Sequence, residues 1–234
     1  MTEGRLAVSR LIANSRFRVR AILVTPAALG VLRGTSGLEV DALPVYVASR
    51  TLIKKIGGYD FHQGCLALAD RPEPETLTAV LENHCSRRPI VVLEQVGNPD
   101  NVGGIFRNAA AFGAAAVLLS PGCCDPLYRK AVRTSIATSL QVPFAVIDDW
   151  PGGLDVVRRQ GYELIALTPD GEATCLEHHK FFENGRSVAL ILGNEGNGLS
   201  SEALAAADAT VRISLDPTVD SLNVATTAAI ALHH

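Results

Sequence analysis

Short apolar runs alternate with amphipathic segments along the 234 residues of the chain. The apolar runs have the length of buried strands, and the segments between them repeat apolar residues with the period of helices. Strands of this kind, each followed by a helix, favour an α/β fold with a parallel sheet covered by helices on both faces. The predicted strands are 19–25, 45–48, 65–69, 90–94, 115–119, 144–147, 164–168, 188–192 and 211–214.

One polar segment interrupts this alternation. Residues 70–75 read Asp-Arg-Pro-Glu-Pro-Glu, a composition typical of a linker. We therefore expect a small domain at 1–70, a linker and connecting helix at 71–86, and a larger domain at 87–234. The predicted helices are 2–13, 26–32, 51–56, 76–85, 102–112, 127–138, 154–160, 201–207 and 222–232.

The composition excludes several classes of protein. Hydrophobic residues make up 47%, enough for a full core, and the 19% of charged residues are too few for a disordered or coiled-coil chain. No apolar run approaches the roughly 18 residues that would span a bilayer. The first residues do not form a basic segment followed by an apolar one, so no signal peptide is predicted.

Charge is distributed unevenly along the chain. Residues 1–60 hold nine Lys and Arg against four Asp and Glu, a balance of +5. The remaining residues hold twelve basic and twenty acidic side chains, a balance of −8. This asymmetry favours a basic N-terminal part that faces a polyanion, with chance clustering on a solvated surface as the alternative.

Cysteine and histidine do not form a metal or disulfide pattern. The five cysteines are an odd number without a C-x-x-C pair, and this favours reduced thiols in a cytoplasmic protein. The adjacent pairs His178-His179 and His233-His234 point in different directions on any regular element, so we predict no metal site. The terminal pair is either native or the remnant of a tag.

Three loops at the predicted carboxyl edge of the sheet carry unusual chemistry, and this is the edge where parallel sheets bind ligands. In the first loop Asn101 is expected to cap a helix, and Gly103-Gly104 allow another backbone or a ligand to come close. Arg107 lies in an apolar stretch and needs an anionic partner, either a phosphate or a carboxylate such as Glu94.

The other two loops follow the strands at 188–192 and 211–214. Residues 193–198 are rich in glycine and carry Glu195, so they expose backbone groups to anything that lies on them. In the third loop Asp220 or Ser221 is expected to cap the last helix, with Asn223 in its first turn. None of the loops fits the dinucleotide or Walker phosphate fingerprint.

Together the three loops resemble the signature motifs of the SpoU/TrmH family of RNA 2′-O-ribose methyltransferases, in the SPOUT superfamily. The resemblance spans about 89–232, and Leu215 stands where the family often has methionine. Residues 1–70 resemble the ribosomal-protein-like RNA-binding domain often found upstream, with His62-Gln63-Gly64 at its usual end. The motif residues are Asn101, Gly103 and Arg107, then Leu192, Gly193, Glu195 and Gly198, then Ser221, Leu222, Asn223 and Val224.

The resemblance implies a parallel-sheet SPOUT fold with a C-terminal trefoil knot, S-adenosylmethionine as cofactor, and a homodimer with the catalytic cleft between subunits. It implies that the backbones of Gly193, Ile213 and Leu222 hold the methyl donor, with Thr168 on the pocket wall. A side chain at residue 193 would then fill the donor's space.

The same resemblance places catalysis on Arg107, acting with the substrate phosphate. Arginine is effectively always protonated, so we expect it to orient the phosphate and the 2′-hydroxyl rather than to act as a simple base. Asn101, Glu195, Ser221 and Asn223 are expected to position Arg107, the ribose or the loops.

The expected substrate is ribosomal RNA, because of the two-domain layout. The alternatives are a transfer RNA 2′-O-methyltransferase, a catalytically silent RNA-binding protein of the same fold, and an NAD-type oxidoreductase. The missing dinucleotide fingerprint disfavours the last of these.

Overall fold

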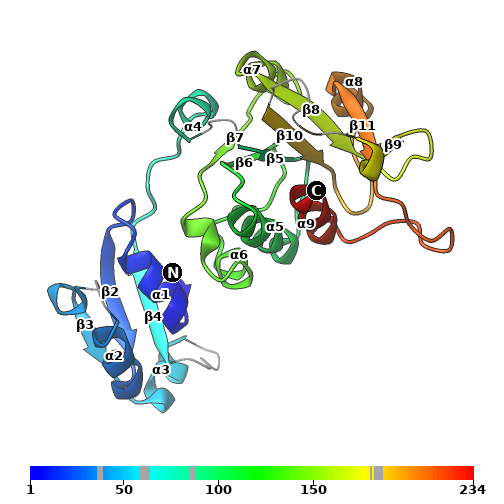
Figure 1. Ribbon diagram of the computed structural model, residues 1–234. Helices are drawn as coiled ribbons and strands as arrows, with labels where there is room; N and C mark the ends of the chain where they lie inside the picture. Colours follow the sequence, from blue (N-terminus) through cyan, green and yellow to red (C-terminus); the bar gives the residue numbers. More distant parts are fainter. Residues whose placement is uncertain (36–38, 58–63, 85–87, 180, 182–186) are drawn as a thin grey trace.

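The computed structural model describes residues 1–35, 39–57, 64–84, 88–179, 181 and 187–234, which form two separate sheets (Figure 1). The smaller sheet belongs to the N-terminal part and has the strand order β1-β4-β2-β3. In it β4 pairs antiparallel with both β1 and β2, and β2 pairs parallel with β3. Its strands are β1 (Thr2–Glu3), β2 (Val19–Val24), β3 (Val45–Val47) and β4 (Cys65–Ala69).

Helices cover both faces of this small sheet. The helices α1 (Arg5–Ile12) and α2 (Pro26–Arg33) share one apolar cluster with β2 and β4, and Ile53 of α3 (Arg50–Gly57) packs on Leu66 from the other side. A single 3-10 turn, Val40–Ala42, precedes β3.

The predicted helix at 2–13 is wrong at its start. Thr2 and Glu3 pair with Ala67 and Leu66 as a strand, and the chain turns into α1 only after Gly4, whose φ is 94°. Of the expected His62-Gln63-Gly64 end of this domain, His62 and Gln63 lie outside the described residues, as does Cys85.

The larger sheet has seven strands in the order β7-β6-β5-β10-β8-β11-β9, and every neighbouring pair is parallel. This confirms the predicted parallel sheet. The short edge strand β9 was not predicted, because two residues are too few to show a pattern. The strands are β5 (Ile90–Leu93), β6 (Val117–Leu119), β7 (Phe144–Val146), β8 (Tyr162–Leu167), β9 (Thr174–Cys175), β10 (Ser187–Leu192) and β11 (Ala209–Arg212).

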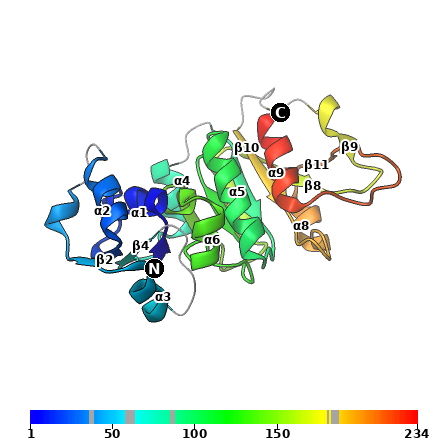
Figure 2. The same ribbon diagram turned by 90° about the horizontal axis from the view of Figure 1, so that it is seen from below.

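Two apolar clusters pack helices on the two faces of this sheet (Figures 1 and 2). On one face lie α5 (Pro99–Ala111) and α9 (Val224–His233), and on the other lie α4 (Leu77–His84), α7 (Leu154–Arg159) and α8 (Ser201–Ala206). None of the described helices is long and apolar enough to cross a membrane.

The helix predicted at 127–138 is shorter in the structure. Helix α6 spans Arg129–Thr134, and the backbone then turns left-handed at Ile136 and Ala137, with φ of 51° and 61°. A 3-10 turn at Thr138–Leu140 follows. Non-glycine residues rarely adopt this backbone conformation, so the residue types gave no signal of the break.

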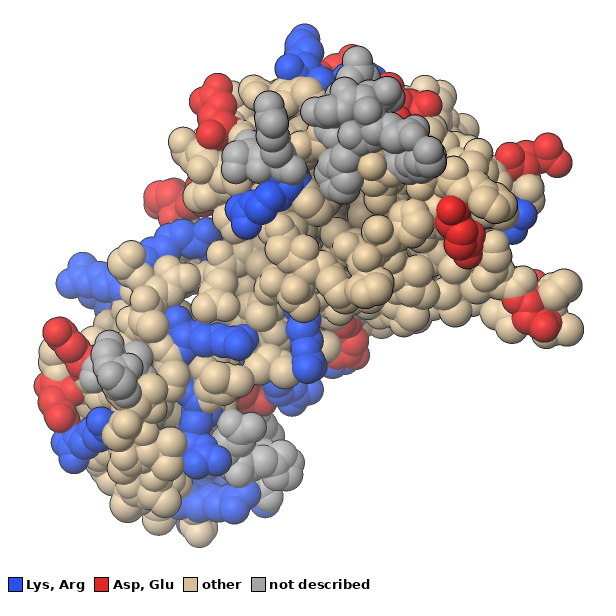
Figure 3. Space-filling model, in the orientation of Figure 1, with Lys and Arg blue, Asp and Glu red and all other residues tan. Residues whose placement is uncertain are grey.

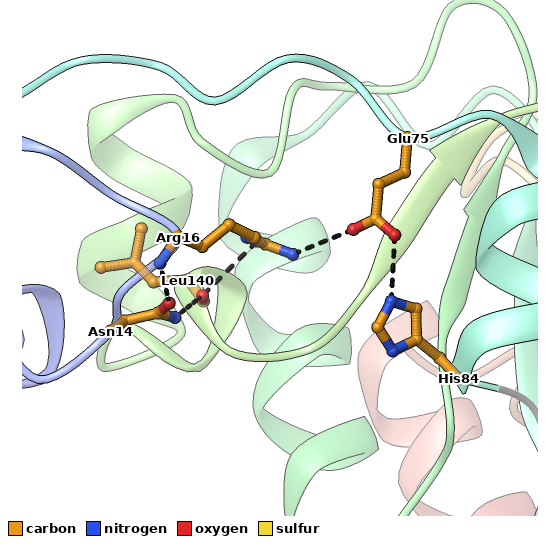
Figure 4. Close-up of polar contacts among 5 residues, drawn as sticks. All are labelled: Asn14, Arg16, Glu75, His84 and Leu140. Atoms are coloured by element: carbon orange, nitrogen blue, oxygen red, sulfur yellow. Dashed lines mark hydrogen bonds and ion pairs between the residues drawn. The ribbon is translucent and has the colours of Figure 1, made fainter.

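The N-terminal part docks on α6 and the turn that follows it. Val132, Ala137 and Leu140 share an apolar cluster with α1 and α2, and the carbonyl oxygen of Leu140 accepts a hydrogen bond from Asn14 Nδ2 at 2.7 Å. Figure 4 shows the neighbouring chain of contacts, in which the Glu75 carboxylate binds both Arg16 Nη1 at 3.5 Å and His84 Nε2 at 2.9 Å. The two parts therefore touch through packed side chains as well as through residues 70–76, which form no helix or strand.

Candidate active site

A cavity of about 400 Å³ lies beyond the carboxyl ends of β8, β10 and β11. Its walls come from the ends of these strands, from the 193–199 loop, and from the segment 213–222 with the start of α9. All four residues expected to hold the donor line it, together with Glu195 and Ser221. The lining residues are Leu167, Thr168, Pro169, Leu192, Gly193, Asn194, Glu195, Gly196, Asn197, Gly198, Leu199, Leu204, Val211, Ile213, Leu215, Asp220, Ser221, Leu222, Val224 and Thr227.

The 193–199 loop is a tight turn closed by its own hydrogen bonds. The backbones of Asn194 and Gly198 bond each other at 2.9 and 3.1 Å, and Asn194 Oδ1 accepts from the backbone N–H of Gly196 at 2.7 Å. A Cβ at Gly193 would lie 2.3 Å from the backbone carbon of Gly198. A side chain at residue 193 would therefore meet the backbone of the loop itself, and the expectation that it also fills the donor's space stays a prediction.

A chain of side-chain hydrogen bonds joins the three loops. Asn101 Nδ2 donates to Glu195 Oε1, and Asn223 Nδ2 donates to Asn101 Oδ1 at 2.8 Å. Asn101 is buried at 8% exposure, whereas Glu195 and Asn223 are exposed. Hydrogen bonds thus join three of the five predicted catalytic residues, and a fourth, Ser221, lines the same cavity as Glu195.

Two predicted helix caps are wrong. Asn98, not Asn101, caps α5, and its Oδ1 accepts from the backbone N–H of Asp100 at 2.9 Å. Asn223, rather than Asp220 or Ser221, caps α9, and its Oδ1 accepts from the backbone N–H of Ala225 at 3.0 Å. Helix α5 begins early because Pro99 fits the first turn, and this frees the Asn101 side chain for Glu195.

The glycine pair of the first loop serves helix packing. A Cβ at Gly103 would lie 2.7 Å from the carbonyl oxygen of Ala131 in α6, and one at Gly104 would lie 3.0 Å from the Cβ of Ala225 in α9. The two glycines were expected to allow close approach of either another backbone or a ligand. In the structure they allow close approach of the neighbouring helices α6 and α9.

Arg107 lies on the exposed side of α5 and does not line the cavity. Within the described parts of the chain it has no hydrogen-bond or ion-pair partner. Glu94, the carboxylate alternative, is 3% exposed and binds Trp150 and Ser200 instead. The hypothesis that Arg107 pairs with Glu94 is therefore wrong.

Two thiols at this edge of the sheet, those of Cys123 and Cys124, are unsuited to nucleophilic chemistry. Cys123 Sγ donates to the carbonyl oxygen of Leu93 at 3.3 Å, and burial raises the pKa of this thiol above its ordinary value. Burial also raises the pKa of Cys124. Both groups stay protonated at neutral pH, so a thiolate mechanism is disfavoured.

Sequence reasoning missed the residues that hold the 193–199 loop from outside, Glu94 and Gln95. Glu94 directly follows an apolar strand, which is a weak signal of a buried and specifically bound carboxylate. Its partners Trp150 and Ser200 lie 56 and 106 residues away along the chain.

Comparisons with known proteins agree with this geometry. The model of the SpoU rRNA Methylase family matches residues 88–233. An uncharacterized tRNA/rRNA methyltransferase of Mycobacterium tuberculosis is 40% identical over 234 residues, covering 100% of this chain and 79% of that protein. The 23S rRNA (guanosine-2′-O-)-methyltransferase RlmB of Acinetobacter baylyi is 30% identical over 200 residues, covering 83% of this chain and 79% of its own length.

A solved structure shows the same fold. The SpoU methyltransferase AviRb from Streptomyces viridochromogenes, in complex with AdoMet, superimposes with a TM-score of 0.80 at 21% identity. The superposition covers 99% of this chain and 87% of that one. The family predicted from the three loops is confirmed: the chain belongs to the SpoU family of rRNA methylases.

Proposed function

We propose that the chain transfers the methyl group of S-adenosylmethionine to the 2′-hydroxyl of a ribose in ribosomal RNA, with the 400 Å³ cavity as the donor site. The observation that carries this proposal is that the second and third motif loops line one cavity, and that Asn101 of the first motif loop donates a hydrogen bond to Glu195 on its wall. The name of the Acinetobacter relative supports the reaction, and the bound AdoMet in AviRb supports the cofactor.

The cavity has the chemistry that the donor needs. Apolar side chains such as Leu167, Leu192 and Val211 offer a surface for an adenine ring. The turn at Gly193 and the segment through Ile213 and Leu222 bring backbone N–H and C=O groups to the wall, where they can bond the polar edges of the donor. Thr168 completes the wall at the end of β8.

The chemical step needs a ribose oxygen that attacks the methyl carbon. The new O–C bond would form as the S–C bond of the donor breaks. The sulfur would keep that electron pair and leave as S-adenosylhomocysteine, and the hydroxyl proton would pass to an oxygen of the substrate phosphate. Arg107 holds the substrate phosphate and the 2′-hydroxyl and stabilises the developing negative charge on oxygen. The linked side chains of Glu195, Asn101 and Asn223 hold the rim, and Ser221 bonds the substrate.

A homodimer is part of the proposal. Arg107 is exposed and lies outside the cavity of its own chain, which supports a catalytic cleft completed by a second copy.

The trefoil knot is also part of the proposed structure. The packing of α9 on α5, where Asn108 Nδ2 donates to the carbonyl oxygen of Ala225 at 2.7 Å, supports this path of the C-terminal segment.

We further assign residues 1–70 as the RNA-binding domain, 71–86 as linker and connecting helix, and 87–234 as the methyltransferase domain. Figure 3 supports the assignment, because Lys and Arg side chains gather on the smaller unit and along its junction with the larger one. Phosphate contacts from such a surface supply affinity without reading sequence. A cytoplasmic location follows from a ribosomal RNA substrate.

Two neighbouring threonines of α9 test the donor site. Thr227 lines the cavity, whereas Thr226 is exposed and does not. Thr227→Phe is expected to weaken S-adenosylmethionine binding at least tenfold in calorimetry, because the larger side chain occupies the cavity. Thr226→Phe, the matched control, is expected to bind as the wild type does.

Equal binding by both variants would remove the cavity as the donor site. Binding of NAD in place of S-adenosylmethionine would favour the oxidoreductase alternative, and binding of neither would favour a silent RNA-binding protein. Comparing methyl transfer to ribosomal and to transfer RNA then decides between the two substrates.

A further inference from the structure

Glu94 is a buried carboxylate that no step of the proposed methyl transfer uses. It directly follows β5 and is 3% exposed. Its backbone N–H donates to the carbonyl oxygen of Leu192 at 2.9 Å, so it lies where β10 turns into the 193–199 loop. A buried charge is costly unless hydrogen bonds satisfy it, so its partners define its role.

Three donors from two distant segments converge on this carboxylate. Ser200 donates its hydroxyl to Oε1 at 2.6 Å and its backbone N–H to Oε2 at 2.8 Å. Trp150 Nε1 donates to Oε1 at 2.7 Å. Ser200 directly follows the 193–199 loop and caps α8 by accepting from the backbone N–H of Ala203 at 3.1 Å. Glu94 therefore ties the end of the loop to the sheet.

The next residue, Gln95, ties down the beginning of the same loop. Its carbonyl oxygen accepts from Asn194 Nδ2 at 2.9 Å, and its backbone N–H donates to the buried Ser120 hydroxyl at 2.9 Å. The φ of Gln95 is 52°, a backbone conformation that residues with a side chain rarely adopt. In this conformation the carbonyl group of Gln95 points toward the loop and accepts the bond from Asn194. Two consecutive residues thus hold both ends of the loop whose residues line the cavity.

We propose that Glu94 is a positioning residue for the methyl donor. By holding Ser200, its carboxylate sets the position of the 193–199 loop against the opposite wall, which the segment 213–222 forms. Glu94 does not line the cavity, so it acts on the donor through the loop. This inference rests on the proposed function, because it takes the cavity as the donor site.

Glu94→Gln is the sharpest test, since it keeps the shape and removes one acceptor. If the amide nitrogen replaces Oε2, it faces the N–H of Ser200. If it replaces Oε1, it faces the indole N–H of Trp150. Either orientation sets two donors against each other and takes one acceptor from Ser200: that of its backbone N–H in the first case and that of its hydroxyl in the second. The loop end is therefore held more weakly. We expect S-adenosylmethionine to bind roughly tenfold more weakly, and KM for the donor to rise while kcat at saturating donor changes little.

Trp150→Phe is the matched control. It removes a hydrogen bond from the same buried carboxylate but leaves both bonds from Ser200, so it should lower the melting temperature without changing donor affinity more than about twofold. Ser200→Ala removes the hydroxyl on the loop side and should weaken donor binding as Glu94→Gln does. The two loop-side changes together should weaken it less than the product of their separate effects.

The proposal is overturned if Glu94→Gln melts lower yet binds the donor as the wild type does, or if Trp150→Phe weakens binding as much as Glu94→Gln. If Glu94→Gln does not fold, Ser200→Ala gives the same decision. Failure of the proposed function looks different, because Thr227→Phe would then also leave donor binding unchanged. Weak binding by Thr227→Phe with normal binding by both loop-side variants would refute only the role of Glu94.

Discussion

Replacing Arg107 separates a catalytic role from a structural one. The side chain is exposed and has no hydrogen-bond or ion-pair partner within the described residues, so Arg107→Ala breaks no polar interaction of the folded chain there. Exposed substitutions of this kind change the free energy of unfolding by no more than about 0.5 kcal/mol. For a chain of this length that corresponds to a change in melting temperature of less than about 2 °C.

The expected effect on methyl transfer is far larger. Loss of one group that stabilises developing charge in the transition state costs about 3–4 kcal/mol, or a rate lower by roughly two to three orders of magnitude. Arg107→Lys keeps the charge but loses the planar fork, so it should be nearly as slow as Arg107→Ala. The proposed interaction of Arg107 is made mainly in the transition state, so we expect RNA affinity to fall much less than turnover.

Single-turnover methylation, measured beside thermal melts and donor calorimetry, checks this prediction. Wild-type melting and donor binding with collapsed turnover support the assignment. An Arg107→Ala protein that methylates within about threefold of the wild-type rate would refute the reasoning, since that loss is under 1 kcal/mol. A large drop in melting temperature would show instead that Arg107 has a structural partner.

Packing and charge elsewhere in the molecule give three more predictions. The double variant Lys54→Glu, Lys55→Glu on α3 should lower RNA affinity and leave donor binding unchanged. The slope of log affinity against log salt should fall by about one for each phosphate that the variant no longer binds. An unchanged slope would exclude α3 from the RNA surface. Gly103→Ala should destabilise the fold by about 1–3 kcal/mol in denaturant titration, because its Cβ would lie 2.7 Å from the carbonyl oxygen of Ala131. An unfolding midpoint equal to that of the wild type would contradict this packing. Burial raises the pKa of Cys65 to about 12, so at pH 8 only roughly one such thiol in ten thousand is ionised. Iodoacetamide should therefore label Cys65 in the unfolded protein but not in the native protein. Rapid labelling of the native protein would contradict the burial of this thiol.

The fold and the meeting of the three loops were predictable because their signals are local. Each buried strand is an apolar run, and parallel strands bring the loops that follow them to one edge. The exposed position of Arg107 was also predictable from the sequence, although the expectation that an arginine in an apolar stretch needs an anionic partner did not use it. Ile105, Phe106 and Ala109 are buried, and the helical period then places residue 107 on the opposite face.

The hydrogen bonds that organise the site were not predictable, because they join distant residues. Asn98 and Asn101 are both suitable caps, and only the bond from Asn101 to Glu195, 94 residues away, shows which one is free. Likewise, nothing near Glu94 in the sequence indicates that Ser200 and Trp150 satisfy its charge. Polar partners of this kind are selected by the completed fold rather than by local preference.

The most direct test of the central claim is where the methyl group goes on the RNA. The protein is incubated with ribosomal RNA and S-adenosylmethionine labelled in the methyl group, and the product is hydrolysed in alkali. Alkaline cleavage of RNA requires a free 2′-hydroxyl, so ribose 2′-O-methylation leaves the label in alkali-resistant dinucleotides. We predict label in that fraction, and none with Arg107→Ala over a single wild-type turnover time. Label released in mononucleotides would show methylation of a base, and label in neither fraction would show no transfer to this RNA; either result would contradict the assignment.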